Sequence, residues 1–163
     1  MFEHFSPGLD LAAEAEALRV SGRSDLLTLD DLYPDALPTL QALAQRGYRL
    51  ALAANQPAPA GDVLAAMAVP FAVIGTSGAW GVAKPDPAFF RRLLDELRLP
   101  AAAVAYVGDR VDNDIAPARE VGMPSILIRR GPWAWMPGFA AGAARATAVV
   151  DSLTELLALL PPR

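Results

Sequence analysis

The chain of 163 residues has no cysteine and only one lysine, and its charges nearly balance, with 14 basic against 18 acidic side chains. Without cysteine there is no disulfide framework, no thiolate nucleophile and no zinc site built on sulfur. The slight acidic excess argues against broad electrostatic binding to nucleic acid or to an anionic membrane. No apolar run approaches the roughly 18 residues of a spanning helix, and no basic segment with an apolar run opens the chain. We therefore expect a soluble cytoplasmic protein that binds neither nucleic acid nor a membrane, with its oligomeric state left open.

Hydrophobic residues are plentiful and basic residues are almost all of one kind. The hydrophobic fraction is 53%, with 33 alanines, which is enough for one folded domain with a real core. Arginine supplies 13 of the 14 basic residues, so the single lysine, Lys84, stands out. Lysine is a compact point charge and arginine a planar fork, and the two do not substitute for each other at a tight site. The alternative is a surface lysine ahead of a helix that begins at a proline.

Short apolar runs alternate with segments of helical period, which predicts an α/β fold. Strands are expected at residues 48–54, 71–75, 104–107, 125–128 and 148–150. Helices are expected at residues 9–20, 33–47, 62–67, 86–97, 115–121 and 152–160, and irregular loops at 75–81 and 131–146. Continuous apolar strands alternating with helices predict a three-layer, Rossmann-like fold, with a mostly parallel sheet covered by helices on both faces.

Polar residues follow three of the expected strands, where ligands bind in sheets of this kind. Asn55 follows the first strand, Lys84 lies shortly beyond the second, and Asp109 comes directly after the third. Asp112 and Asp114 follow within the next residues. Clustered carboxylates are costly unless a cation neutralises them, and hard oxygen ligands suit Mg²⁺. The alternative is a solvated acidic loop in which an aspartate caps the next helix.

Three weaker features accompany this cluster. The tryptophans Trp80, Trp133 and Trp135 line a substrate mouth or pack over the edge of the sheet, and we favour packing. Arg129-Arg130 ends a strand and either faces the site or is solvated. The small residues 75–78 are a weak candidate for a phosphate cradle.

Two segments resemble motifs of the haloacid dehalogenase (HAD)-like hydrolase superfamily: Lys84-Pro85-Asp86-Pro87, and Gly108-Asp109 through Asp114. The resemblance covers residues 32–160. It implies a phosphatase-type hydrolase acting on a small phosphorylated molecule with Mg²⁺ as cofactor. In that family Lys84 would be the lysine that steadies nucleophile and phosphate, and Asp109 and Asp114 the metal ligands. Ala54 stands where the family has a hydroxyl residue, so Asn55 is the remaining candidate to bind the phosphoryl group.

The family's nucleophile motif, Asp-x-Asp after a first strand, has no match here. The N-terminal candidates are Asp10, Asp25 and the pair Asp30-Asp31, and none follows an apolar strand. The chain thus resembles a truncated member, or one whose start is assigned too late. Residues 1–30 would be a remnant of a helical cap and residues 31–163 the α/β core. Without this motif, the chain is expected to have no phosphatase activity and to bind Mg²⁺ only weakly. The alternatives are a non-catalytic domain that binds a phosphorylated ligand or a protein, and a structural remnant.

The missing strand also bears on the sheet. The family's usual order puts that strand between the one ending at Asn55 and the one ending at Gly108. A strand-long row of unpaired buried backbone groups would cost more than a small domain's stability. We therefore expect residues 48–54 and 104–107 to pair directly; the alternative is that an N-terminal segment or another chain fills the slot.

Overall fold

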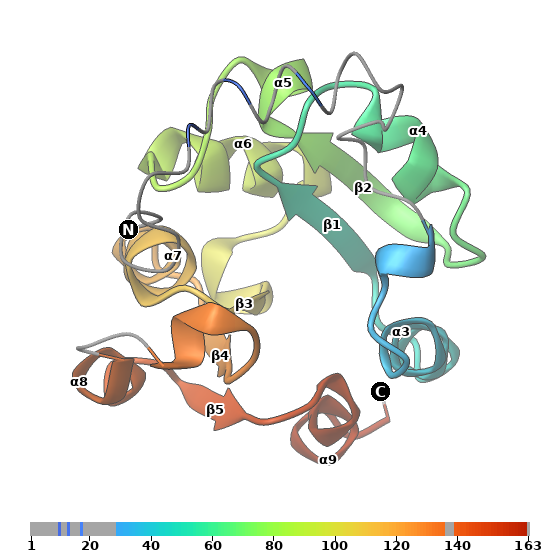
Figure 1. Cartoon of the computed structure of the whole chain (residues 1–163). Coiled ribbons are helices and arrows are strands. Elements are labelled where there is room, and N and C mark those ends of the chain that lie inside the picture. Colours follow the sequence, from blue (N-terminus) through green and yellow to red (C-terminus); the bar gives the residue numbers. More distant parts are fainter. Residues whose placement is uncertain (1–9, 11–12, 14–16, 18–28, 136–138, 163) are drawn as a thin grey trace.

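The computed structural model describes residues 10, 13, 17, 29–135 and 139–162, in which strands and helices alternate (Figure 1). The strands are β1 (Leu50–Ala54), β2 (Phe71–Thr76), β3 (Tyr106–Gly108), β4 (Ser125–Ile128) and β5 (Ala148–Val150). The helices are α3 (Ala36–Gln45), α4 (Ala60–Ala65), α5 (Ser77–Trp80), α6 (Pro87–Leu97), α7 (Ala116–Glu120), α8 (Phe139–Ala143) and α9 (Leu156–Leu159). The helix expected over residues 9–20, like most of the expected cap remnant, lies outside the described residues apart from isolated positions.

The strand pairs that the structure describes are all parallel, as the alternation of elements predicts. β1 pairs with β2, and its last residue, Ala54, lies opposite Thr76. β3 pairs with β4 and β4 with β5, in the order β3-β4-β5. The carboxyl ends of neighbouring parallel strands therefore meet at one edge, where the residues that follow β1, β2 and β3 come together.

Helices cover both faces of the strands, and side chains of each strand alternate between the two. On one face, Ala51, Ala53 and Tyr106 pack with the buried side chains of α6 and α7. On the other, Leu50 and Val107 pack with Leu43 of α3 and Leu156 of α9. Because β1 and β3 contribute to the same core on each face, the five strands lie in one layer of an α/β, three-layer fold.

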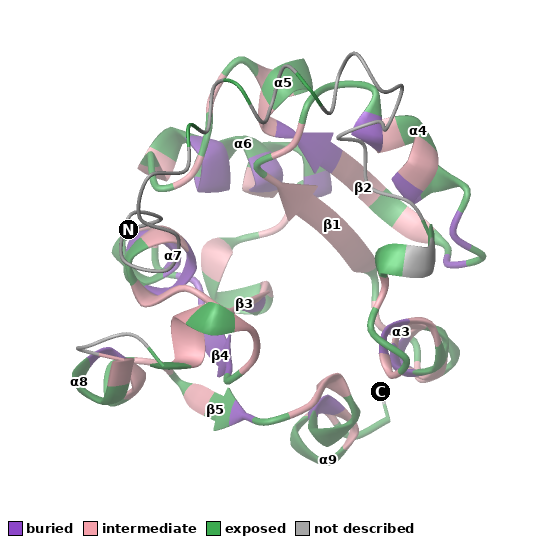
Figure 2. Cartoon of the chain, in the orientation of Figure 1, coloured by how far each residue is buried: buried purple, intermediate pink, exposed green. Residues whose placement is uncertain are grey.

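The expected direct pairing of β1 with β3 is wrong. The described strands form two separate sheets, β1-β2 and β3-β4-β5. A side chain joins them instead, because the Tyr106 hydroxyl donates a hydrogen bond to the Ala53 carbonyl at 3.1 Å. The expectation assumed that the facing edges are buried. Figure 2 shows that β1 is of intermediate exposure along its whole length. In β3 only Tyr106 is buried, so the cost that was to force closure is smaller.

Two segments expected to be irregular contain short helices. Residues 75–81 include α5, whose N-terminus is capped by the Thr76 hydroxyl accepting from the Ala79 backbone N–H at 3.2 Å. Such a cap stabilises a helix too short to show a hydrophobic period. Residues 131–146 hold a 3₁₀ turn (Pro132–Trp135) and α8. Here the tryptophans and prolines obscured the local periodicity.

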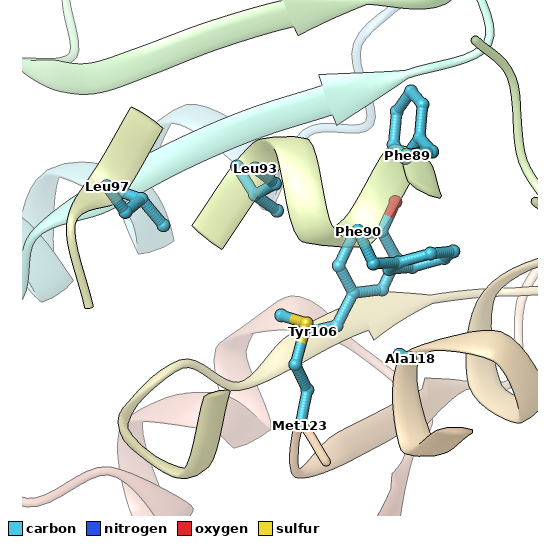
Figure 3. Packing of buried hydrophobic residues seen from close by; sticks show 7 residues of the cluster. All are labelled: Phe89, Phe90, Leu93, Leu97, Tyr106, Ala118 and Met123. Atoms are coloured by element: carbon cyan, nitrogen blue, oxygen red, sulfur yellow. The ribbon is translucent and has the colours of Figure 1, made fainter. Parts of the chain in front are cut away.

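Helix α6 is the part of the fold that presents Lys84 to the strand ends. Asp86 caps it by accepting a hydrogen bond from the Ala88 backbone N–H at 2.8 Å, and Pro87 occupies its first turn. In Figure 3 Phe90 of this helix lies against Tyr106 of β3, and it meets the Tyr106 ring edge-on at a centroid distance of 4.9 Å. This packing holds the N-terminal end of α6, which follows Lys84 closely in the chain, against β3.

Candidate functional site

Lys84 and Asp114 form a buried ion pair at the carboxyl edge of the strands. Their Nζ and Oδ1 atoms are 2.7 Å apart, the Lys84 side chain is 12% exposed, and Asp114 is 2% exposed. The other Asp114 oxygen accepts a hydrogen bond from the Arg110 backbone N–H at 3.0 Å. Gly108 permits this approach, because a Cβ on it would lie only 2.4 Å from the Asp114 Cβ. The two segments that carry the motifs are therefore joined directly.

Asn55 binds the backbone of Lys84 through both polar atoms of its side-chain amide. Its Nδ2 donates to the Lys84 carbonyl at 2.9 Å, and its Oδ1 accepts from the Lys84 N–H at 2.8 Å. The residue after β1 thus holds the lysine in place. A primary amide carries two hydrogens, and no described residue accepts the second one of Asn55, which is therefore available to a ligand.

Tyr106 borders the ion pair, although no sequence pattern distinguishes it from the other residues of its strand. Lys84 Nζ lies 5.5 Å from the centroid of its ring. Burial raises the pKa of Tyr106 to about 12, against the opposing charge of Lys84. Burial also works against the Lys84 ammonium, but the Tyr106 oxygen and the Asp114 carboxylate outweigh it and raise the pKa of Lys84. Both groups therefore keep their protons at neutral pH.

Asp109 is the second carboxylate of the site. Burial, followed by repulsion from Asp114, raises the pKa of Asp109, which means that its charge is incompletely balanced by its neighbours. In the described part of the chain no three acidic, histidine or cysteine side chains come together as a metal-binding group. Mg²⁺ is commonly bound through one or two carboxylates, with water and substrate phosphate as its other ligands. The donor set fits a Mg²⁺ that a phosphate helps to bind, and does not fit one held by protein alone.

The remaining charges of this loop are paired at the surface. Arg110 donates to both oxygens of Asp112, at 3.1 and 2.6 Å, and its guanidinium lies 4.2 Å from the centroid of the Trp133 ring. The Arg110 hydrogen bonds hold the pKa of Asp112 below its usual range. Another tryptophan, Trp80, does not take part in the loop and packs against Phe89 in the core, with ring centroids 5.0 Å apart. The three carboxylates of the loop thus differ: Asp114 contacts Lys84, Asp109 interacts electrostatically with both of them, and Asp112 is exposed.

A second cluster lies beside Asp109, and sequence reasoning did not identify it as a unit. Arg130 donates to both oxygens of Asp35, at 3.0 and 2.5 Å, and its guanidinium lies 4.1 Å from the centroid of the Tyr33 ring. The Arg130 hydrogen bonds lower the pKa of Asp35. The only hint of this cluster in the sequence is the doublet Arg129-Arg130 at the end of a strand. Its two members differ, since Arg129 pairs with the exposed Asp151 while Arg130 faces inward.

Comparison with known proteins agrees with the motifs. A family model described as haloacid dehalogenase-like hydrolase matches residues 2–122. Phosphoglycolate phosphatase of Rhodospirillum rubrum is 35% identical over 127 residues, which are 75% of this chain and 52% of that protein. The chain therefore spans about half the length of this relative. Among the described residues, no helix combines the length and hydrophobicity needed to cross a membrane.

Solved structures share the fold. A HAD phosphatase from Thermococcus onnurineus superposes with a TM-score of 0.69 at 25% identity, over 95% of this chain and 67% of that one. D,D-heptose 1.7-bisphosphate phosphatase from B. bronchiseptica, whose crystals contain magnesium and phosphate, superposes with a TM-score of 0.60 at 21% identity, over 78% of this chain and 82% of that one. The arrangement of strands and helices described above is thus that of known phosphatase structures.

Proposed function

The chain belongs to the haloacid dehalogenase-like hydrolases, and we propose that it is a phosphatase-type member whose Lys84–Asp109–Asp114 site binds a small phosphorylated molecule together with Mg²⁺. The observation that carries the proposal is the junction of a buried lysine with one of two neighbouring carboxylates at the edge where the strands end. An ammonium beside a metal-binding carboxylate pair supplies positive charge on two sides of a phosphate. Bound Mg²⁺ would screen the phosphate's negative charge.

Each residue has a part in this proposal. Lys84 is the phosphate-binding residue of the site and the steadying residue of the family's reaction. Asp109 and Asp114 would hold the metal, and Asp114 also fixes the ammonium through the 2.7 Å contact. Asn55 holds the Lys84 backbone through two hydrogen bonds and offers its remaining amide hydrogen to the phosphate.

We further propose that these 163 residues do not hydrolyse a phosphate ester by themselves. The family's reaction needs a nucleophilic aspartate and a second aspartate that transfers a proton, in an Asp-x-Asp pair ahead of β1. No such pair precedes β1 in the sequence. Lys84, Asp109 and Asp114 can bind and orient the ester, but none of them replaces the nucleophile. Within this reading, residues 31–163 are the core and residues 1–30 derive from a cap.

Calorimetric titration with inorganic phosphate tests the binding site, in the presence and absence of Mg²⁺. Phosphate is expected to bind with Mg²⁺ present, and both Lys84→Met and Asp109→Asn are expected to abolish the binding. Asp112→Asn is the matched control, because Asp112 belongs to the same loop but is 74% exposed and paired with Arg110. Phosphate binding that survives Asp109→Asn, or that Asp112→Asn removes equally, would contradict the site.

Incubation with p-nitrophenyl phosphate and Mg²⁺ tests the absence of hydrolysis. No turnover is expected from the purified chain. Turnover that disappears in the Asp109→Asn protein belongs to this chain and not to a contaminant, and it would overturn the non-hydrolytic part of the proposal.

A further inference from the structure

Tyr33 is a half-exposed residue whose ring is held in one orientation. It follows the 3₁₀ turn Leu29–Asp31 and is 52% exposed. The Arg130 guanidinium lies over its ring, and Arg130 is in turn fixed by two hydrogen bonds to Asp35. Asp35 also accepts a hydrogen bond from the Leu153 backbone N–H at 2.9 Å. Three segments distant in the sequence therefore cooperate to position an aromatic side chain that the core does not bury.

The hydroxyl of Tyr33 and the carboxylate of Asp109 both lie close to Gly131. A Cβ on Gly131 would lie 3.9 Å from the Tyr33 hydroxyl oxygen and 3.8 Å from Asp109 Oδ2. Gly131 has a φ of +67°, a conformation that disfavours any other residue. Because glycine has no side chain, nothing from this position fills the space between the carboxylate and the phenol. No hydrogen bond joins the Tyr33 hydroxyl to another of the described residues, so it can both donate and accept.

We propose that Tyr33 and Gly131 form the subsite for the alcohol part of the phosphate ester, and that they favour an alcohol with its own oxygen substituent. This inference rests on the proposed function, which puts the phosphate beside Asp109 and Lys84. The ester's carbon chain passes over Gly131, and the Tyr33 hydroxyl hydrogen-bonds to a hydroxyl or carboxylate oxygen of the chain. Arg130 and Asp35 are positioning residues, since they act on the ligand only through the Tyr33 ring. A purely apolar alcohol leaves the Tyr33 hydroxyl without a partner.

Three probes separate the subsite from the phosphate site: inorganic phosphate, ethyl phosphate and glycerol 3-phosphate, each titrated calorimetrically with Mg²⁺ present. Tyr33→Phe is expected to weaken glycerol 3-phosphate roughly three- to tenfold, the loss of one hydrogen bond, and to leave the other two ligands unchanged. Gly131→Ala, which fills the space, is expected to weaken both esters and spare inorganic phosphate. Tyr48→Phe is the matched control, since the Tyr48 hydroxyl bonds to the Pro161 carbonyl at the opposite end of β1.

The outcomes distinguish the two proposals. Loss confined to glycerol 3-phosphate in Tyr33→Phe supports the subsite. Equal affinity of wild type and Tyr33→Phe for glycerol 3-phosphate, with inorganic phosphate still bound, overturns the subsite and leaves the phosphate site standing. Failure of the wild type to bind inorganic phosphate overturns both.

Discussion

Replacing Lys84 with methionine is expected to destabilise the protein by about 3 kcal/mol. The change removes the ammonium that lies 2.7 Å from Asp114, a carboxylate that is 2% exposed. Leaving one member of a buried pair alone costs about 3–5 kcal/mol, and the Arg110 N–H that still donates to Asp114 favours the lower end. The converse change, Asp114→Asn, is expected to cost less, about 2 kcal/mol, because the ammonium still interacts with the Asp109 charge and with the Tyr106 ring.

The double mutant separates the ion pair from its surroundings. Lys84→Met with Asp114→Asn is expected to be about 2 kcal/mol more stable than the sum of the single changes predicts. Urea unfolding followed by tryptophan fluorescence measures this, since Trp80 packs in the same core. The control is the exposed pair Arg92–Glu96 of α6, also at 2.7 Å, for which a coupling of only about 0.5 kcal/mol is expected. Additive losses at Lys84 and Asp114, or an equally strong coupling in the control pair, would refute the reasoning.

Two further predictions concern stability. Gly108→Ala is expected to lower the free energy of unfolding by about 2 kcal/mol, because the new Cβ clashes with Asp114. Gly61→Ala in α4 is expected to raise it by about 0.5–1 kcal/mol, because a Cβ there meets only a side-chain atom at 3.9 Å. Thermal unfolding that ranks the two variants otherwise would contradict the packing. Because Arg130 lowers the pKa of Asp35 below its ordinary 3.8, the stability that Asp35 contributes is present above that pH and is lost as the pH falls through the lower folded-state pKa. Wild type and Asp35→Asn are therefore expected to converge in stability on acidification. A difference in stability that persists to the lowest pH would contradict the role of the Asp35 charge.

The sequence predicted those parts of the fold that depend on local pattern. The strands β4 and β5 coincide with the expected apolar runs, and α6 begins at the proline that follows Asp86. The meeting of Lys84 with Asp114 follows from a general property of parallel sheets, whose strand ends share an edge. These features require only short stretches of sequence and one rule of topology.

Contacts between segments that are distant in the chain could not be predicted from the sequence. Arg130 and Asp35 are 95 positions apart, and neither carries a pattern that identifies the other as its partner. Tyr106 reads as one more apolar residue of β3, although its hydroxyl joins the two sheets through Ala53. The wrong expectation of direct pairing between β1 and β3 has the same origin, since it depended on how deeply their edges are buried.

The separation of the strands into two sheets has a consequence for the protein in concentrated solution. No described strand pairs with the side of β1 that faces β3, or with the side of β3 that faces β1. Backbone N–H and C=O groups on such edges are templates for intermolecular β-pairing, the route by which proteins swap domains and aggregate. Natural sheets commonly guard an edge with charge or proline, but β1 reads Leu-Ala-Leu-Ala-Ala. Any self-association through these edges is accordingly expected to increase with protein concentration and to be suppressed by a charged substitution in β1.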